Sequence, residues 1–210
     1  NKDLGRLFVN TAMPLRLLFT KHMLPIFAAH EGVPGHHLQL MRQLRDEQGK
    51  PKIRTHVGQY ATDFAEGWAT YVERWSDEQG FFTGTQHVGY LHKQLTNAAR
   101  LVVDVGLHTG KMTRDEAIAY VNKNVYLPKF LARSEIDRYL NLPGQALTYH
   151  LAQQQLVESK SNVRQLLGAQ FNEREYHDRL LDMGLGTSKQ ISRAMTKWAQ
   201  AKVSRPTQPR

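Results

Sequence analysis

The chain has 210 residues and a formal net charge of +9, and its 40% hydrophobic and 22% charged residues are typical of an ordinary globular protein. It is long enough to bury a sizeable core, and no apolar run approaches the roughly 18 residues that indicate a membrane-spanning helix. It has no cysteine, which excludes disulfides and thiolate ligands, so any transition-metal site must use histidines and carboxylates.

The positive charge is scattered along the chain and forms no basic run with interleaved aromatic residues, so nucleic acid is not an expected partner. The lack of cysteine slightly favours an exported protein, periplasmic or lipid-anchored, over a cytoplasmic one.

Periodicity and capping signals predict an almost entirely helical chain. The strand candidate is 5–11, an edge strand near Phe8. Helices are predicted over 18–45 with an interruption at Pro34-Gly35, over 60–79, over 88–108, from Thr113 onward, and over 134–139, 146–167, 172–183 and 188–202. Gly80 is expected to form a left-handed cap, and Thr113 a capping box with Glu116. We therefore expect a mainly α fold, with one helical catalytic domain over 1–197 and a basic, flexible tail over 198–210.

Two strings predict a metal site. Residues 30–37 are HEGVPGHH and residues 65–73 are AEGWATYVE. Two histidines, a glutamate and a water make an open catalytic zinc site, so we expect one Zn²⁺ per chain, bound by His30, a later histidine and Glu66. Glu31 would then be the general base that activates the water. The alternative is a non-catalytic, metal-stabilised domain in which Glu31 is only structural.

The histidine spacing departs from the common H-E-x-x-H motif, because position i+4 is Pro34. On an unbroken helix, His36 and His37 would lie about 9 and 10.5 Å along the axis from His30, too far to share one ion. Pro34 and Gly35 favour a two-residue helix bulge that would bring His36 to the i+4 position. We therefore predict His36 as the second ligand, with His37 as the alternative ligand or as a residue that orients one.

The helix that carries Glu66 has two further features. Gly67 is expected to let this helix approach the metal-binding helix closely. Glu73 lies two turns after Glu66 on the same face, where it would accept a hydrogen bond from a ligand histidine or form an ion pair with Arg74 or a nearby lysine. The sequence does not decide between these roles.

Arg100, Asp104 and His108 form one stripe of a helix, at i, i+4 and i+8. Asp104 is expected to select a tautomer of His108, and His108 to stabilise an oxyanion beside the metal. Arg100 would hold a substrate carboxylate. A surface ladder of salt bridges is the alternative interpretation of the stripe.

Polar residues also flank Pro143-Gly144, namely Glu135, Arg138, Tyr139, Gln145 and Tyr149. The hydroxyl of Tyr149 is the predicted donor to a tetrahedral intermediate, although tyrosines are also common in helical cores. His177 and Asp178 are expected to be structural.

The strings HEGVPGHHLQ, FAEGWATYVE, RLVVDVGLH, RYLNLPGQALTY and YHDRLLDMG resemble, in this order, the C-terminal half of the bacterial "domain of unknown function 885" family. The resemblance spans roughly residues 5–197. It implies a gluzincin-like catalytic half of a zinc peptidase, with an N-terminal part of the same protein as a partner. Departures occur at Ala152 and at Gly186-Thr187-Ser188, which lie away from the proposed metal and concern substrate contacts.

Two wider similarities bear on the ligands. The string 65–73 is similar to the segment that supplies the third zinc ligand in aminopeptidases of the aminopeptidase N type. Gly35-His36 resembles the end of the zinc motif in thimet-type oligopeptidases and in dipeptidyl peptidase III. The resemblance thus implies His30, His36 and Glu66 as ligands and Glu31 as the base. The expected function is zinc-dependent hydrolysis of peptides, as a carboxypeptidase if Arg100 faces the cleft or as an oligopeptidase. Non-peptide amides and esters are alternative substrates for the same site.

Overall fold

The protein is helical throughout the region that the computed structural model describes, which comprises residues 8, 20–45, 62–184 and 186–204. No described residue lies in a strand, so the predicted mainly α fold is confirmed. Phe8 is not in a strand, and the remainder of the strand candidate 5–11 lies outside the described residues. No helix in these ranges is both long and apolar enough to cross a membrane.

The helices follow one another along the chain. They are α1 (Leu24–Glu31), α2 (His36–Arg45), α3 (Thr62–Glu78), α4 (Thr85–His108), α5 (Arg114–Asn124), α6 (Lys129–Asn141), α7 (Gln145–Leu167), a 3₁₀ turn η4 (Gly168–Gln170), α8 (Glu173–Asp182) and α9 (Ser188–Val203).

Local signals in the sequence placed several helix ends correctly. Gly80 follows α3 with a φ of 77°, and Thr113 forms the predicted capping box with Glu116 at the start of α5. The last helix extends to Val203, past the boundary expected at residue 197, so the first part of the predicted tail is helical. Residues 205–210 lie outside the described residues.

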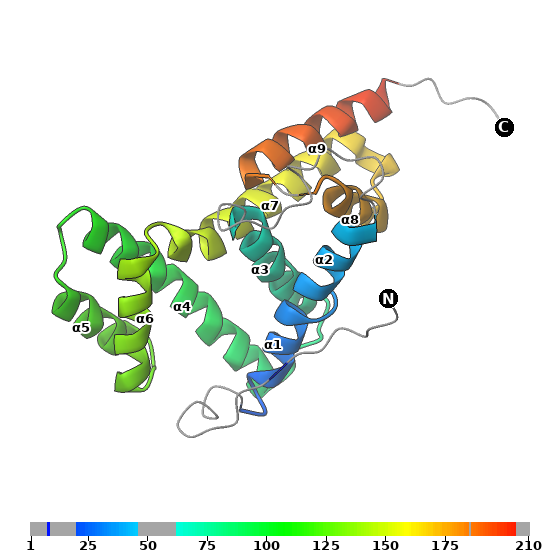
Figure 1. Ribbon diagram of the computed structural model, residues 1–210. Helices are drawn as coiled ribbons and strands as arrows, with labels where there is room; N and C mark the ends of the chain where they lie inside the picture. Colours follow the sequence, from blue (N-terminus) through cyan, green and yellow to red (C-terminus); the bar gives the residue numbers. More distant parts are fainter. Residues whose placement is uncertain (1–7, 9–19, 46–61, 185, 205–210) are drawn as a thin grey trace.

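The long helix α7 connects two groups of helices (Figure 1). Its first turns lie beside α4 and α6, and its later part packs against α3 and α9. One hydrophobic core joins α3, α7, α8 and α9 and includes the fully buried Trp68, Leu156 and Tyr176. A second core joins α4, α5, α6 and the start of α7 around Val103, Ile136 and Ala146.

A close helix contact positions α3. A Cβ added to Gly67 would lie 2.4 Å from the Cβ of Ala152 on α7, so only glycine fits at this crossing. The expectation that Gly67 permits approach to the metal-binding helix is therefore wrong, because the helix that approaches is α7. Thr70 strengthens the same crossing by donating to the carbonyl oxygen of Tyr149 at 2.8 Å.

His177 on α8 lies within an aromatic cluster of the first core, as expected for a structural residue. Its Nε2 lies 2.7 Å from the hydroxyl of Tyr71, and the rings of Trp68, Trp75 and Tyr176 surround it. Burial and the nearby charge of Lys160 lower the pKa of His177 to about 4.

We predict that Gly67→Ala will destabilise the protein by about 1–3 kcal/mol, because the added methyl group has no space against Ala152. In the double variant Gly67→Ala, Ala152→Gly the methyl groups exchange places, so part of this loss should be recovered. Urea unfolding of the four proteins of this double-mutant cycle measures the coupling. Strictly additive effects at the two positions would show that the crossing is not sterically limited.

We also predict that His177 makes the protein less stable in mild acid. The unfolded histidine takes up a proton near its ordinary pKa of 6.5, whereas the folded one does so near 4, so stability falls as the pH drops from 6.5 to about 4. His177→Gln keeps an acceptor for Tyr71 and should flatten this part of the curve of unfolding free energy against pH. His22→Gln, at an exposed position, is the control and should leave the slope unchanged.

Candidate metal centre

The chain makes a tight turn between the two helices that carry the histidines. α1 ends at Glu31, and α2 begins at His36. The expected two-residue bulge in a continuous helix is therefore wrong, because four residues separate two distinct helices. A Cβ at Gly35 would lie only 1.8 Å from the carbonyl oxygen of His30, so the lack of a side chain lets the chain pass directly over the end of α1. Trp68 of α3 holds the turn by donating to the carbonyl oxygen of Pro34 at 3.0 Å.

This turn brings His30 and His36 together over Glu66. The two imidazole rings lie 4.8 Å apart between centroids and are nearly perpendicular. Oε2 of Glu66 lies 3.4 Å from Nε2 of His30 and 3.5 Å from Nε2 of His36. This oxygen is buried and has no hydrogen-bond partner. Among the residues that the structure describes, these three side chains form the group that could hold a metal ion, with donor atoms within 4.8 Å of one another.

A buried ion pair orients His30 from behind. Its Nδ1 forms a short hydrogen bond with Oε1 of Glu73, whose side chain is fully buried. Lys93 of α4 contacts the same oxygen at 2.6 Å. Glu73 thus has both roles that the sequence left open. It forms a hydrogen bond with a histidine and an ion pair with a lysine.

The hydrogen bonds select the tautomers of both histidines. In the neutral form of His30, Nδ1 donates to Glu73 and Nε2 therefore carries the lone pair that faces Glu66. Nδ1 of His36 lies 3.4 Å from Oε1 of Gln39, which favours the same tautomer in His36. A partner at Nδ1 that leaves Nε2 free is the usual arrangement around histidines that bind metals.

Burial and neighbouring charges together set the pKa values of the groups in the cluster. Burial acts to raise the pKa of Glu66, but the two neighbouring imidazoles outweigh it and hold that pKa far below its ordinary value. For Glu73, burial is likewise outweighed by Lys93 and His30, so its pKa is lowered. Burial and Lys93 act to lower the pKa of His30, yet its contacts with Glu66 and Glu73 raise it overall. Both carboxylates are therefore ionised, Glu66 at the centre and Glu73 behind His30.

The other candidates from the first motif lie beside the cluster. Glu31 ends α1 with an exposed side chain that forms no hydrogen bond or ion pair with the described residues. His37 is half-buried in α2 and is not one of the three clustered residues. The structure thus brings His36, rather than His37, to His30 and Glu66.

Two expectations for the stripe on α4 are wrong. Asp104 does not bind His108, since both its carboxylate oxygens accept from the backbone N–H of Gly144, at 3.2 and 3.3 Å. His108 donates from Nε2 to the carbonyl oxygen of Tyr139. It lies about 22 Å along α4 from Lys93, at 1.5 Å per residue, and therefore far from His30. Both residues stabilise the turn between α6 and α7.

Arg100 is partly buried and is paired with neighbouring side chains. Its guanidinium donates to the hydroxyl of Tyr139, to Oδ1 of Asn97 and to Oε2 of Glu135, at 2.9–3.0 Å. It also stacks over the ring of Tyr149 at 4.3 Å. Burial acts against its charge, but Tyr139 and Glu135 outweigh this and raise its pKa.

Tyr149 lies between this arginine and the metal cluster. Its hydroxyl accepts from Nε2 of Gln145 at 3.0 Å, and its backbone carbonyl binds Thr70, one turn after Glu66. Burial and the charge of Glu66 raise the pKa of Tyr149. Its phenol therefore keeps its proton at neutral pH and can donate it in a hydrogen bond.

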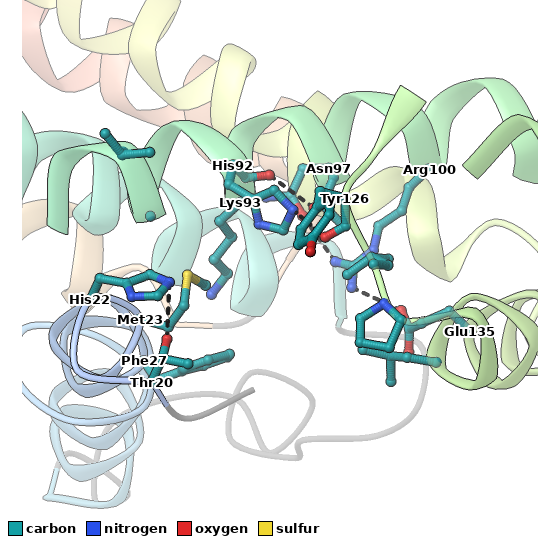
Figure 2. A pocket seen from close by; sticks show the side chains of 16 residues that line it. Thr20, His22, Met23, Phe27, His92, Lys93, Asn97, Arg100, Tyr126 and Glu135 are labelled. Carbon is teal, nitrogen blue, oxygen red and sulfur yellow. Dashed lines mark hydrogen bonds and ion pairs between the residues drawn. The ribbon is translucent and has the colours of Figure 1, made fainter. Parts of the chain in front are cut away.

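A pocket of about 760 Å³ lies beside Lys93 (Figure 2). It is lined by α1, α4, α6 and the segment 126–128, and it includes Lys93, Asn97 and Arg100. His30, His36 and Glu66 are not among its lining residues. The pocket adjoins the metal cluster through the pair of Lys93 and Glu73.

The sequence analysis missed three residues that support the cluster. Gln39 follows His36 by three residues, so helical spacing could have identified it as a neighbour. Trp68 and Lys93 reach the cluster through contacts between separate elements, and no pattern in the sequence indicates such contacts.

Comparisons with known proteins agree with this architecture. Two solved structures are similar in fold. A putative lipoprotein from Colwellia psychrerythraea is 33% identical with a TM-score of 0.80, and the match covers 86% of this chain and 31% of that chain. A putative lipoprotein of unknown function from Shewanella oneidensis is 25% identical with a TM-score of 0.76, and the match covers 86% and 32%. The chain thus spans about a third of the length of these two proteins.

No curated protein matches this chain. The family model described as "Bacterial protein of unknown function (DUF885)" matches residues 1–195, nearly the whole length of the chain. The five ordered strings predicted this family, and the protein belongs to it.

Proposed function

We propose that His30, His36 and Glu66 bind one Zn²⁺ and that this centre hydrolyses peptide bonds. The observation that carries the proposal is the position of Oε2 of Glu66. This oxygen is buried without a hydrogen-bond partner and lies 3.4 and 3.5 Å from the Nε2 atoms of two histidines. A buried polar atom without a partner is costly, and a cation at this point would satisfy it.

The donor set suits zinc in number, type and spacing. Ligands that bind zinc tetrahedrally at about 2.0–2.1 Å lie roughly 3.4 Å apart, close to both distances from Glu66. Two histidines and one glutamate leave a fourth position for water, as catalytic zinc sites require. A structural zinc site would instead have four protein ligands, and the described residues offer three at this point.

The chain supplies groups that move protons beside this centre. When bound, zinc would supply Lewis-acid activation of a water molecule and of the scissile carbonyl. Glu31 directly follows His30 and has no hydrogen-bond or ion-pair partner among the described residues, so its carboxylate can take a proton from the attacking water. As the C–N bond breaks, Glu31 returns that proton to the leaving amine. The hydroxyl of Tyr149 remains protonated and would donate a hydrogen bond to the substrate oxygen as it becomes negative.

The location of the protein is part of the same proposal. Two proteins of similar fold are described as putative lipoproteins. We infer that proteins containing this chain are exported and lipid-anchored. The natural substrates would then be peptides outside the cytoplasm.

We predict about one zinc per chain in the purified protein, lost in His36→Ala and retained in His37→Ala. The reason is that only His36 lies over Glu66 with His30. Plasma mass spectrometry of the dialysed proteins gives the metal content, and circular dichroism verifies that both variants fold. A wild-type chain that binds no zinc even when zinc is supplied would overturn the proposal.

We predict that Glu31→Gln will keep its zinc but lose about 10²–10⁴-fold in the rate of peptide hydrolysis, because a glutamine cannot accept the proton. Mass spectrometry of a defined peptide mixture measures the cleavage. Glu158→Gln makes the same change at an exposed site on α7 and should be fully active. Retained zinc with unchanged turnover in Glu31→Gln would instead favour a metal centre without this base. Parallel assays with esters and non-peptide amides test the alternative substrates.

A further inference from the structure

The pocket beside α4 has an apolar side and a polar side. Figure 2 shows Met23 and Phe27 of α1 facing α4, from which Lys93, Asn97 and Arg100 project. These three residues follow one another at i, i+4 and i+7, so they form one stripe along the helix. Val88, Leu127, Pro128 and Leu131 add further apolar lining. A volume of about 760 Å³ is within the range of sites that bind small ligands.

The charged groups at one end of the pocket already satisfy one another. Oε2 of Glu135 accepts from Arg100, from Arg138 and from the hydroxyl of Tyr139, all within 3.0 Å. Nε of Arg138 donates to the other oxygen of Glu135 at 3.2 Å. The charge of Glu135 is therefore already balanced by two arginines, which disfavours a cationic ligand at this end.

Asn97, in contrast, has a donor with no partner. Its Oδ1 accepts from Arg100 at 2.9 Å, while its Nδ2 is buried and has no hydrogen-bond partner. The residue is 1% exposed. An amide nitrogen carries two donors, and leaving both unpaired in a buried position costs stability. A ligand that enters the pocket next to Asn97 would remove this cost if it brings an acceptor oxygen.

The charge balance favours a negatively charged acceptor. Arg100 and Arg138 share the single carboxylate of Glu135, which leaves one positive charge in excess. The neighbouring Lys93 is paired through one contact with Glu73, and its ammonium carries three donors. The unmet groups on this wall are thus donors and positive charge.

We propose that this pocket binds a carboxylate of the substrate peptide, with one of its oxygens accepting from Nδ2 of Asn97 beside Lys93. The apolar lining then accommodates the side chain next to that carboxylate. The role as a substrate subsite rests on the proposed peptidase function, because Lys93 and Glu73 connect the pocket to His30. Binding of the carboxylate itself does not depend on zinc.

The test is calorimetric titration of the whole chain with N-acetyl-leucine and with N-acetyl-leucinamide, which differ only in the carboxylate. We expect the acid to bind at least about tenfold more tightly than the amide, as for a hydrogen bond to a charged group. N-acetylglutamic acid amide and N-acetylglutamine amide form a second pair. This pair tells a side-chain carboxylate from a C-terminal one.

Asn97→Asp is the decisive variant, because it keeps the acceptor for Arg100 and replaces the free donor with a negative charge. It should abolish the preference for the acid. Asn172→Asp makes the same change at the N-cap of α8, where aspartate also caps well, and should bind as the wild type does. Leu131→Trp would fill the pocket from α6 and should abolish binding even if Asn97→Asp folds poorly.

Equal binding of acid and amide would overturn the proposal, as would no binding of either pair or unchanged binding by Asn97→Asp. Titrations of zinc-free protein and of His36→Ala show whether carboxylate binding depends on the metal site. Carboxylate binding that persists without zinc supports the pocket even if no peptidase activity is found.

Discussion

The buried carboxylate of Glu73 is the interaction on which the candidate centre depends. A fully buried charge is tolerated only when it is paired and hydrogen-bonded, and Glu73 finds its partners on two other helices, His30 on α1 and Lys93 on α4. The three helices are therefore joined at one point. This junction fixes the ring of His30 and directs its Nε2 toward Glu66, so an ion pair outside the donor set determines the geometry of the donors.

The second constraint is the tight passage of the chain over the end of α1. Gly35 lies so close to the carbonyl oxygen of His30 that no other residue fits, and Trp68 fixes the same turn through Pro34. Together they convert a spacing that is too long for one helix into a close pair of histidines. The longer motif thus brings its two histidines close together through a tight turn between two helices instead of one turn of a continuous helix.

Local features of the sequence predicted most of the fold. Amphipathic periods, the capping box at Thr113 and the left-handed Gly80 depend on neighbouring residues, so they are visible in the sequence alone. The grouping of His30, His36 and Glu66 was also predictable, because it follows from ligand chemistry and from the break at Pro34-Gly35. The roles of Asp104 and His108 were not predictable. Both side chains form hydrogen bonds with backbone groups at the turn between α6 and α7. Helical spacing shows which residues share a face but not which element packs against it.

Lys93 explains how two separate features of the molecule are related. Its ammonium contacts Glu73, and its side chain also lines the pocket. The same lysine thus neutralises the carboxylate that orients His30 and contributes positive charge to the wall beside Asn97. Since Arg100 is bound to Glu135, Tyr139 and Asn97, it acts as part of that wall and keeps the side chains of α4 in place. Through this stripe α4 is joined to α1, α3 and α6, so the pocket is held at a fixed position relative to the histidines. A site that places one end of a peptide near a metal would require such a fixed position.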